Sequence, residues 1–317
     1  MKNPIMILLF VLLPFFILAQ SPNKKAGKSP PVSETVTRLP LTVDAWEFQA
    51  GKVSFLQHKG VDAVKMDEKS GSMLYRNLNF TNGSIEFDVE VDRPQPFPSL
   101  YFRLQNPEET ELVYLRTGVA GKKNASDAVQ YASIIKGVNL WDVQYEYQSA
   151  AEIKVNEWNH VKITVSGKQL KVYVNHQSHP NLEIPCLEGN TSEGKIGIGT
   201  GFEGKVIFAN ITVSQDVEGL SAEPGADITA HDTRYIRNWQ ISTPDTLEYG
   251  REPGVFMLPK TDTVWEKIEA ERRGFVNLSR KLGSTNFRRF IWLRATVKSE
   301  FNQPVMMADL FLYLYFP

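Results

Sequence analysis

The segment from Glu157 to Asn175 constrains the fold of this chain more than any other stretch. On either side of a Ser-Gly-Lys turn, apolar residues occupy every second position: Val161, Ile163, Val165, Leu170, Val172 and Val174. Because successive side chains of a strand point to opposite faces, each apolar set lies on one face. Gly167 can adopt the positive φ that a tight turn requires. The segment therefore predicts a β-hairpin with one apolar and one polar face.

The same alternation continues through residues 41–215, where short strands are separated by Gly, Asn and Pro turns without a long helical period. This pattern predicts an all-β fold, an antiparallel sandwich. Hydrophobic residues make up 42% of the chain, which is enough for a sizeable core. Cys186 is the only cysteine, so no internal disulfide stabilises the fold. We interpret Cys186 as a small packing residue, because its neighbours Pro185 and Leu187 offer no base that would make it a nucleophile.

Three motifs resemble the concanavalin A-like (laminin G-like) jelly-roll family. They are Trp158 before a strand pair that ends Val-Tyr-Val-Asn, the run 80–89 in which a Gly precedes alternating residues, and Gly-rich 194–199 followed by 206–213. The resemblance covers roughly residues 42–213. It implies an antiparallel jelly-roll sandwich, but one fold serves many activities, so it does not assign a function.

The N-terminal segment predicts export from the cytoplasm. Lys2 precedes an apolar run from Ile5 to Leu18, and Ala19-Gln20 is a plausible cleavage position, so residues 1–20 are interpreted as a signal peptide. A retained membrane anchor is the alternative. Residues 21–40 are rich in Lys, Ser and Pro and are interpreted as a flexible tether. The expected location is secreted, periplasmic or on the cell surface.

A second β-rich region follows an acidic, Gly- and Pro-containing linker at residues 216–232. Residues 233–317 resemble the first half of a galactose-binding-like β module, on the basis of Trp239-Gln-Ile-Ser, Trp265 and the strand that begins at Leu293. This stretch is shorter than such modules usually are. We therefore expect either a truncated C-terminus or an apolar tail, residues 310–317, that folds back as a strand across the first domain.

Tyrosines and arginines alternate with apolar residues on two neighbouring predicted strands. If the apolar residues between them face the core, Tyr101, Arg103, Tyr114 and Arg116 share the other face, and residues of the next strands or loops can join them. Aromatic rings stack on the C–H face of a sugar, and the guanidinium fork donates to its hydroxyls. The simpler alternative is ordinary cross-strand pairing on a solvated face. The predicted ligand-binding residues are Tyr101, Arg103, Tyr114, Arg116, Tyr131 and Trp141.

A second pattern places Glu86, Asp88 and Glu90 on one face of a strand. Laminarinase-like retaining glycoside hydrolases of the same fold carry a Glu-x-Asp-x-Glu strand, in which two carboxylates serve as nucleophile and acid/base. Here the strand comes too early in the chain for that role. The three acids are therefore interpreted as the solvated side of a strand whose other side is buried, and no catalytic residue is predicted.

Charge and metal-ligand patterns exclude several classes of function. The formal net charge is −1 and the pI about 6.6, so the sequence predicts no nucleic-acid partner and, after signal cleavage, no membrane partner. No cofactor is expected. Calcium is possible, because laminin G-like domains hold Ca²⁺ in oxygen-rich loops such as 106–111 and 124–127, although both are more simply solvated turns. The identity of any metal ligands stays unknown.

The sequence thus favours a secreted carbohydrate-binding protein that recognises a poly- or oligosaccharide on the concave sheet face of its jelly roll. Whether it is an enzyme stays open. A glycoside hydrolase-like enzyme of the same fold, related to 3-keto-disaccharide hydrolases or laminarinases, is the alternative. A protein-interaction module without sugar specificity is the third possibility.

Overall fold

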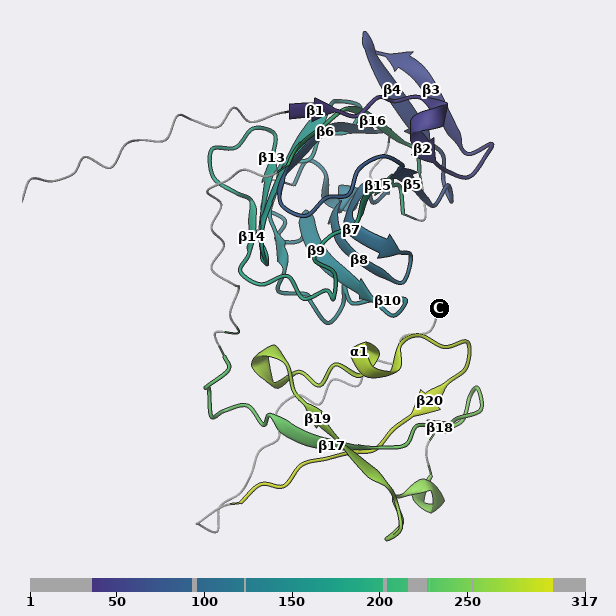
Figure 1. Cartoon of the computed structure of the whole chain (residues 1–317), viewed down its shortest axis with the longest axis vertical. Helices are drawn as coiled ribbons and strands as arrows, with labels where there is room; N and C mark the ends of the chain where they lie inside the picture. The colour runs from purple at the N-terminus through teal and green to yellow at the C-terminus, as the bar shows by residue number, and fades with distance from the viewer. Residues whose placement is uncertain are drawn as a thin grey trace, which may run out of the picture. The chain divides into compact units, whose positions relative to one another are not determined.

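The computed structural model describes residues 36–92, 96–122, 124–201, 204–215, 227, 229–252 and 254–298. Two large antiparallel sheets form a sandwich (Figure 1). Sheet A has the strand order β14 (Leu182–Ile184), β13 (Gln169–Val174), β12 (Asn159–Ser166), β6 (Gly83–Val91), β16 (Val206–Gln215), β4 (Val61–Met66), β3 (Val53–His58), with β1 (Val36–Arg38) also paired to β16.

Sheet B lies opposite sheet A across the core. Its strand order is β10 (Val138–Asn139), β9 (Val129–Ile135), β8 (Glu109–Leu115), β7 (Ser99–Asn106), β15 (Lys195–Gly199), β5 (Ser72–Tyr75), β2 (Trp46–Glu47), and β11 (Gln148–Ser149) pairs with β9. Single 3₁₀ turns lie at η1 (Val43–Ala45) and η2 (Thr117–Val119). The predicted all-β antiparallel sandwich is confirmed.

Alternation along the strands produces the core between the sheets. On β12, Val161, Ile163 and Val165 are no more than 1% exposed, and the residues between them lie nearer solvent. One continuous apolar cluster contains these valines and isoleucines together with residues from both sheets. Its largest fully buried side chains include Trp46, Phe80, Phe102, Tyr131 and Phe208. The hairpin pattern therefore predicted the buried face of β12 and β13 correctly.

Two glycines are required by the backbone. Gly167 has φ 55° in the two-residue loop between β12 and β13, as the tight turn demands. Gly83 begins β6 with φ 128°, and a Cβ at this position would lie 1.8 Å from the Ser214 carbonyl oxygen on β16. The glycine before the alternating run thus lets two strands of sheet A approach each other closely.

The sandwich begins earlier than the predicted tether allowed. Residues 36–38 form β1, which pairs with β16 in the register Val36 with Ser214, and Leu39 is buried at 1% exposure. The three residues of β1, Val-Thr-Arg, are all exposed and show no apolar alternation, so no sequence signal separates this strand from a tether. The predicted signal peptide, residues 216–226 of the linker predicted at 216–232, and the tail at 310–317 lie outside the described residues.

Residues after 227 form short elements around two small sheets. The three-stranded sheet has the order β19 (Trp265–Glu269), β17 (Asn238–Ser242), β21 (Leu293–Arg294), and β18 (Asp245–Thr246) pairs with β20 (Arg289–Phe290). The other elements are η3 (Val255–Met257), η4 (Arg272–Gly274) and α1 (Leu278–Leu282). The predicted strand from Trp239 is thus present, while the galactose-binding-like character of this region stays a prediction.

Candidate functional site

An aromatic patch lies on the face of sheet B that points away from the core. Leu112, Tyr114 and Ala132 form a small buried cluster there, and Phe97 and Tyr101 pack against it. The patch exists because β8 and β9 place Leu112 beside Ala132, while the alternate residues of both strands enter the main core. We define the aromatic–arginine cluster as Tyr101, Tyr114, Arg116, Gln130 and Trp141.

Gln130 fixes the polar part of this cluster. Its fully buried side chain accepts hydrogen bonds at Oε1 from the Tyr114 hydroxyl at 2.6 Å and from Arg116 Nε at 3.2 Å. Its Nε2 donates to the Trp141 carbonyl at 2.6 Å. Arg116 Nη2 also donates to the Tyr114 hydroxyl at 3.1 Å. Because one buried amide pairs with donors and an acceptor from three residues, it restricts the arrangement of the cluster.

Arg116 lies beside two aromatic rings. Its guanidinium carbon is 5.5 Å from the centre of the Tyr114 ring and 5.4 Å from the nearest ring centre of Trp141. Both distances are within the range of cation–π attraction. Trp141 is 38% exposed, so part of its indole surface is open to solvent. The cluster therefore offers a ligand a flat apolar ring next to a guanidinium whose Nη1 has no hydrogen-bond partner among the described residues.

The electrostatics of the cluster keep Tyr114 neutral. Burial, with smaller contributions from the negative charges of Asp127 and Asp142, raises the Tyr114 pKa to about 12, although Arg116 opposes the shift. The hydroxyl is therefore a hydrogen-bond donor to Gln130 across the physiological pH range. The influence of Asp127 and Asp142 also shows that two carboxylates lie near this face.

Two predicted ligand-binding residues do not belong to this surface. Tyr131 is 0% exposed in the main core, because it pairs with core residue Val113 and alternates in phase with Val129. Arg103 is 3% exposed, and its guanidinium donates to the Thr81 carbonyl at 2.6 and 2.9 Å and to the Gly167 carbonyl at 2.7 Å. The prediction of a shared surface was wrong for these two residues.

A register irregularity explains the error at Arg103. The pairing of β7 with β8 shifts between Phe102 and Asn106, and Arg103 has a left-handed φ of 50°. Such a bulge breaks the alternation on which the prediction depended. Gln130 was not predicted as a site residue. Its position between the core residues Val129 and Tyr131 places it on the outward face, so the alternation could have indicated it.

The acidic strand has the structure that the simpler interpretation predicted for Glu86 and Asp88, whereas Glu90 is buried at 7% exposure rather than solvated. Ile85, Phe87, Val89 and Val91 of β6 belong to the core, and the three acids lie on the outward face of sheet A. Each acid has a basic neighbour. Lys162 Nζ is 2.8 Å from Glu86, His160 Nδ1 is 2.8 Å from Asp88, and Lys59 Nζ is 2.7 Å from Glu90. These pairs account for the carboxylates without a catalytic role.

One carboxyl is buried inside the sandwich. Glu111 is 0% exposed, it accepts a hydrogen bond from the Tyr131 hydroxyl at 2.7 Å, and its Oε1 has no partner. Burial raises the Glu111 pKa to about 7, although Tyr131 and the positive charge of Arg103 oppose the shift. The sequence placed Glu111 at the end of an oxygen-rich loop. It lies instead within β8, where no ligand from solvent reaches it.

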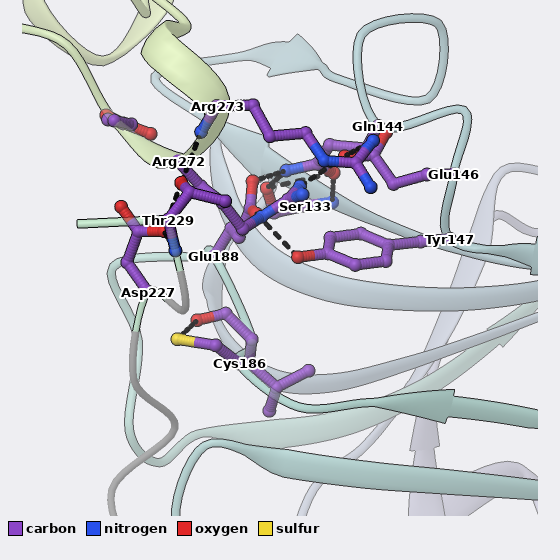
Figure 2. A network of polar contacts seen from close by, with 12 residues as sticks. Ser133, Gln144, Glu146, Tyr147, Cys186, Glu188, Asp227, Thr229, Arg272 and Arg273 are labelled. Atoms are coloured by element: carbon purple, nitrogen blue, oxygen red, sulfur yellow. Dashed lines mark hydrogen bonds and ion pairs between the residues drawn. The ribbon is translucent and has the colours of Figure 1, made fainter. Parts of the chain in front are cut away.

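A polar network joins residues of the sandwich to the segment after residue 227 (Figure 2). Arg272 Nε donates to Glu188 at 2.8 Å and Nη2 to Glu146, and its guanidinium lies 4.6 Å from the centre of the Tyr147 ring. The Tyr147 hydroxyl donates to the same Glu188 oxygen at 2.7 Å. Cys186 lies nearby, and burial raises its thiol pKa, which is consistent with a packing residue rather than a nucleophile.

Metal and membrane signals are both missing from the described part of the chain. In the described ranges, no three His, Cys, Asp or Glu side chains gather closely enough to hold a metal ion. Over the same ranges, no helix has the length and apolar character needed to cross a bilayer.

The comparisons with known proteins point to carbohydrate-related domains. A family profile described as a 3-keto-α-glucoside-1,2-lyase-like domain matches residues 41–214, more than half of the 317-residue chain. No curated protein matches the chain in sequence.

Solved structures resemble the sandwich at low sequence identity. A carbohydrate-binding module from Bacillus subtilis is 16% identical over 54% of this chain and 96% of its own length, with a TM-score of 0.38. A putative glycosyl hydrolase from Parabacteroides distasonis is 14% identical over 58% of this chain and 100% of its own, with a TM-score of 0.41. A Bacillus licheniformis β-glucanase is 12% identical over 59% and 100%, with a TM-score of 0.40.

Proposed function

Because the chain belongs to the family of 3-keto-α-glucoside-1,2-lyase-like domains, we propose that it recognises a glucoside-containing saccharide at the aromatic–arginine cluster of sheet B. The observation that carries this proposal is the open face of Trp141 beside a guanidinium that Gln130 holds in place. The family assignment supplies the ligand class, and the cluster supplies the chemistry that would recognise it.

The cluster suits a sugar for two physical reasons. A pyranose has an apolar C–H face, which stacks on an aromatic ring with its hydroxyls at the periphery. Arg116 lies 5.4 Å from a Trp141 ring centre, so a sugar on Trp141 would bring its hydroxyls or a carbonyl group within reach of the guanidinium donors. Since Gln130 and Tyr114 already orient Arg116, binding would lose little side-chain entropy.

Binding is tested by calorimetry and a glycan array with the full chain. We expect Trp141→Ala to weaken affinity at least about tenfold, because the apolar platform is removed. Tyr145→Ala is the matched control, since Tyr145 is an aromatic residue of the same loop with 60% exposure. Equal affinity of the Trp141→Ala and Tyr145→Ala variants would refute the proposed site.

A lyase is the second candidate function, and the family match favours it. In a 3-keto-glucoside the C2 proton is acidic because it is adjacent to the ketone. A base removes this proton, the C1–C2 double bond forms, and the C1–O bond breaks with its electron pair leaving on the aglycone oxygen, which is then protonated. Arg116 would stabilise the enolate oxygen, and Asp127 or Asp142 would serve as the base.

The lyase is tested with a 3-keto-α-glucoside as substrate. Elimination yields a conjugated enone and one equivalent of free alcohol, so both ultraviolet absorbance and alcohol release are followed. We expect loss of activity in Arg116→Lys, which keeps the charge but not the guanidinium fork. We also expect loss in either Asp127→Asn or Asp142→Asn. Saccharide binding without enone formation would leave the binding function and exclude the lyase.

We also propose that the mature chain acts outside the cytoplasm, and that residues 233–317 form a galactose-binding-like module. The first proposal rests on the signal-like residues 1–20 and the second on the motifs around Trp239 and Trp265. N-terminal sequencing of the exported protein tests the first. A protein that retains Met1 would contradict cleavage.

A further inference from the structure

A hollow lies on the outward face of sheet A, on the opposite side of the sandwich from the aromatic–arginine cluster. Its volume is about 410 Å³, which is within the range of small-molecule sites. The floor comes from three neighbouring strands, because Lys162 of β12 pairs with Glu86 of β6 on one side and with Tyr173 of β13 on the other. We call it the histidine hollow and define it by Glu86, His160, Lys162, Thr164, Tyr173 and His176, with Gln177 at its edge.

Two imidazoles form a flat wall of the hollow. The His160 and His176 rings stack with centroids 4.1 Å apart and planes at 15°. His160 is anchored because Nδ1 contacts Asp88 at 2.8 Å and Nε2 contacts Glu86 at 3.4 Å. His176 is exposed. The stack therefore presents a planar surface at the edge of the hollow.

The backbone that carries His176 is strained. Asn175 and His176 both have left-handed φ values, 53° and 57°. Each such residue costs of order 1 kcal/mol or more, and strain of this kind concentrates at functional sites. Asn175 is held by a hydrogen bond from the His160 backbone N–H at 3.0 Å and by its own donation to the Glu152 carbonyl at 2.7 Å. These contacts maintain the conformation that places one imidazole over the other.

The polar groups of the hollow suit an uncharged ligand with several hydroxyls. Glu86 is paired with Lys162 at 2.8 Å, and Asp88 is paired with His160, so no charge is left uncompensated. Among the residues that the structure describes, the hydroxyls of Thr164 and Tyr173 and the amide of Gln177 have no hydrogen-bond partner. A neutral sugar ring would use these donors and acceptors, whereas an ion would compete with established pairs.

We propose that the histidine hollow is a second saccharide-binding site, so that one sandwich holds a sugar on each of its two outer faces. The proposal takes its ligand class from the proposed function but concerns a different surface and different residues. Two weak sites on opposite faces would let the domain engage a branched or multi-chain glycan with higher avidity than either site alone.

The test is nuclear magnetic resonance of the full chain with ¹⁵N-labelled histidine, titrated with methyl α-D-glucopyranoside. The chain has only five histidines, so the signals of His160 and His176 are assignable by single substitutions. We expect both imidazoles to shift with a saturating dose dependence that is unchanged in Trp141→Ala. Thr164→Val should weaken this binding about fivefold, because one hydrogen bond is lost. Glu183→Gln, at the exposed residue of the neighbouring strand β14, is the matched control and should have no effect.

The first two of three outcomes distinguish failure of the second site from failure of the proposed function. If Trp141 fluorescence reports binding while His160 and His176 do not shift, the second site is refuted and the proposed function survives. If the imidazoles shift and Thr164→Val titrates like wild type, the shift comes from elsewhere and the hollow is refuted. If neither probe responds to the glucoside, both proposals fail for this ligand class.

Discussion

The outward faces of sheets A and B differ in how they satisfy polar side chains. On sheet A, Glu86 and Asp88 of β6 are partly exposed and pair with Lys162 and His160, while the more buried Glu90 pairs with Lys59. On sheet B, the centre of the equivalent face is buried at Tyr114 and Gln130, and the uncharged amide of Gln130 joins Tyr114 to Arg116. Ion pairs near water contribute little stability, whereas a buried hydrogen-bond network is costly to disrupt. Similar alternating strands therefore produce one face on which polar substitutions should cost little stability and one on which they should cost much.

Gln130→Leu tests the difference between the two faces most strongly, because it removes the amide at the centre of the buried network. The substitution keeps the approximate volume but leaves the Tyr114 hydroxyl and the Trp141 carbonyl without their buried partner. We expect a loss of about 3 kcal/mol in the free energy of unfolding, because each unsatisfied buried group costs about 1–3 kcal/mol. Urea denaturation measures it. A loss no larger than that of a surface substitution would mean that the two faces do not differ.

Glu111→Gln tests how a buried carboxyl on the inward side of sheet B affects stability. The Glu111 pKa is raised to about 7, so the folded state holds a proton that the unfolded state has released above pH about 4.5. The free energy of unfolding of the wild type therefore falls as pH rises between these values. Gln carries no charge and can still accept from Tyr131. We expect the variant to match the wild type near pH 4 and to be about 2–3 kcal/mol more stable at pH 8.

Denaturant curves at several pH values check this prediction. Glu109→Gln, on the same strand and less buried, is the control and should show no comparable pH dependence. A constant difference between Glu111→Gln and wild type at all pH values would contradict a neutral buried carboxyl.

Asp88→Asn measures the aspartate–histidine pair on the face of sheet A. Hydrogen bonds from His160 and Asn210 lower the Asp88 pKa although burial opposes them, and the bond to Asp88 raises the His160 pKa. The contribution of Asp88 to the free energy of unfolding is lost as pH falls through its lowered pKa. The contribution of His160 is lost as pH rises through its raised pKa. We expect a loss of about 1 kcal/mol near pH 5.5 that shrinks above pH 8, measured by thermal or urea unfolding.

The sequence predicted the sandwich well because alternation is a local property. The buried positions Val161, Ile163 and Val165 and the outward orientation of Glu86 and Asp88 on β6 follow from the period of the strand alone. The candidate site was predicted in part. Tyr101 and Tyr114 lie together because β7 and β8 keep the expected phase there, and Arg116, directly after β8, lies beside the rings of Tyr114 and Trp141.

The remainder depends on contacts that are distant in sequence. Arg103 left the predicted surface because of a bulge, which is set by the pairing of β7 with β8 and β15 rather than by its own neighbours. Arg272 and Glu188 are 84 residues apart in the sequence, and no local sequence pattern predicts their contact. Tyr131 is a different case. Its spacing of two residues from Val129 indicated the core face, but it was predicted to bind a ligand because tyrosine is chemically suited to sugars.

Lys162→Met is the smallest expected effect and completes the comparison. The side chain of Lys162 is 40% exposed and its ammonium pairs with Glu86 at 2.8 Å, and methionine keeps most of the aliphatic stem. Exposed pairs typically contribute less than about 1 kcal/mol, and salt screens them. We therefore expect a change within about 0.5 kcal/mol in dilute buffer that becomes unmeasurable at high salt. Urea titrations of Lys162→Met and Gln130→Leu are compared side by side. Equal losses in the free energy of unfolding would show that the buried network of sheet B is no more costly to disrupt than the exposed ion pair of sheet A.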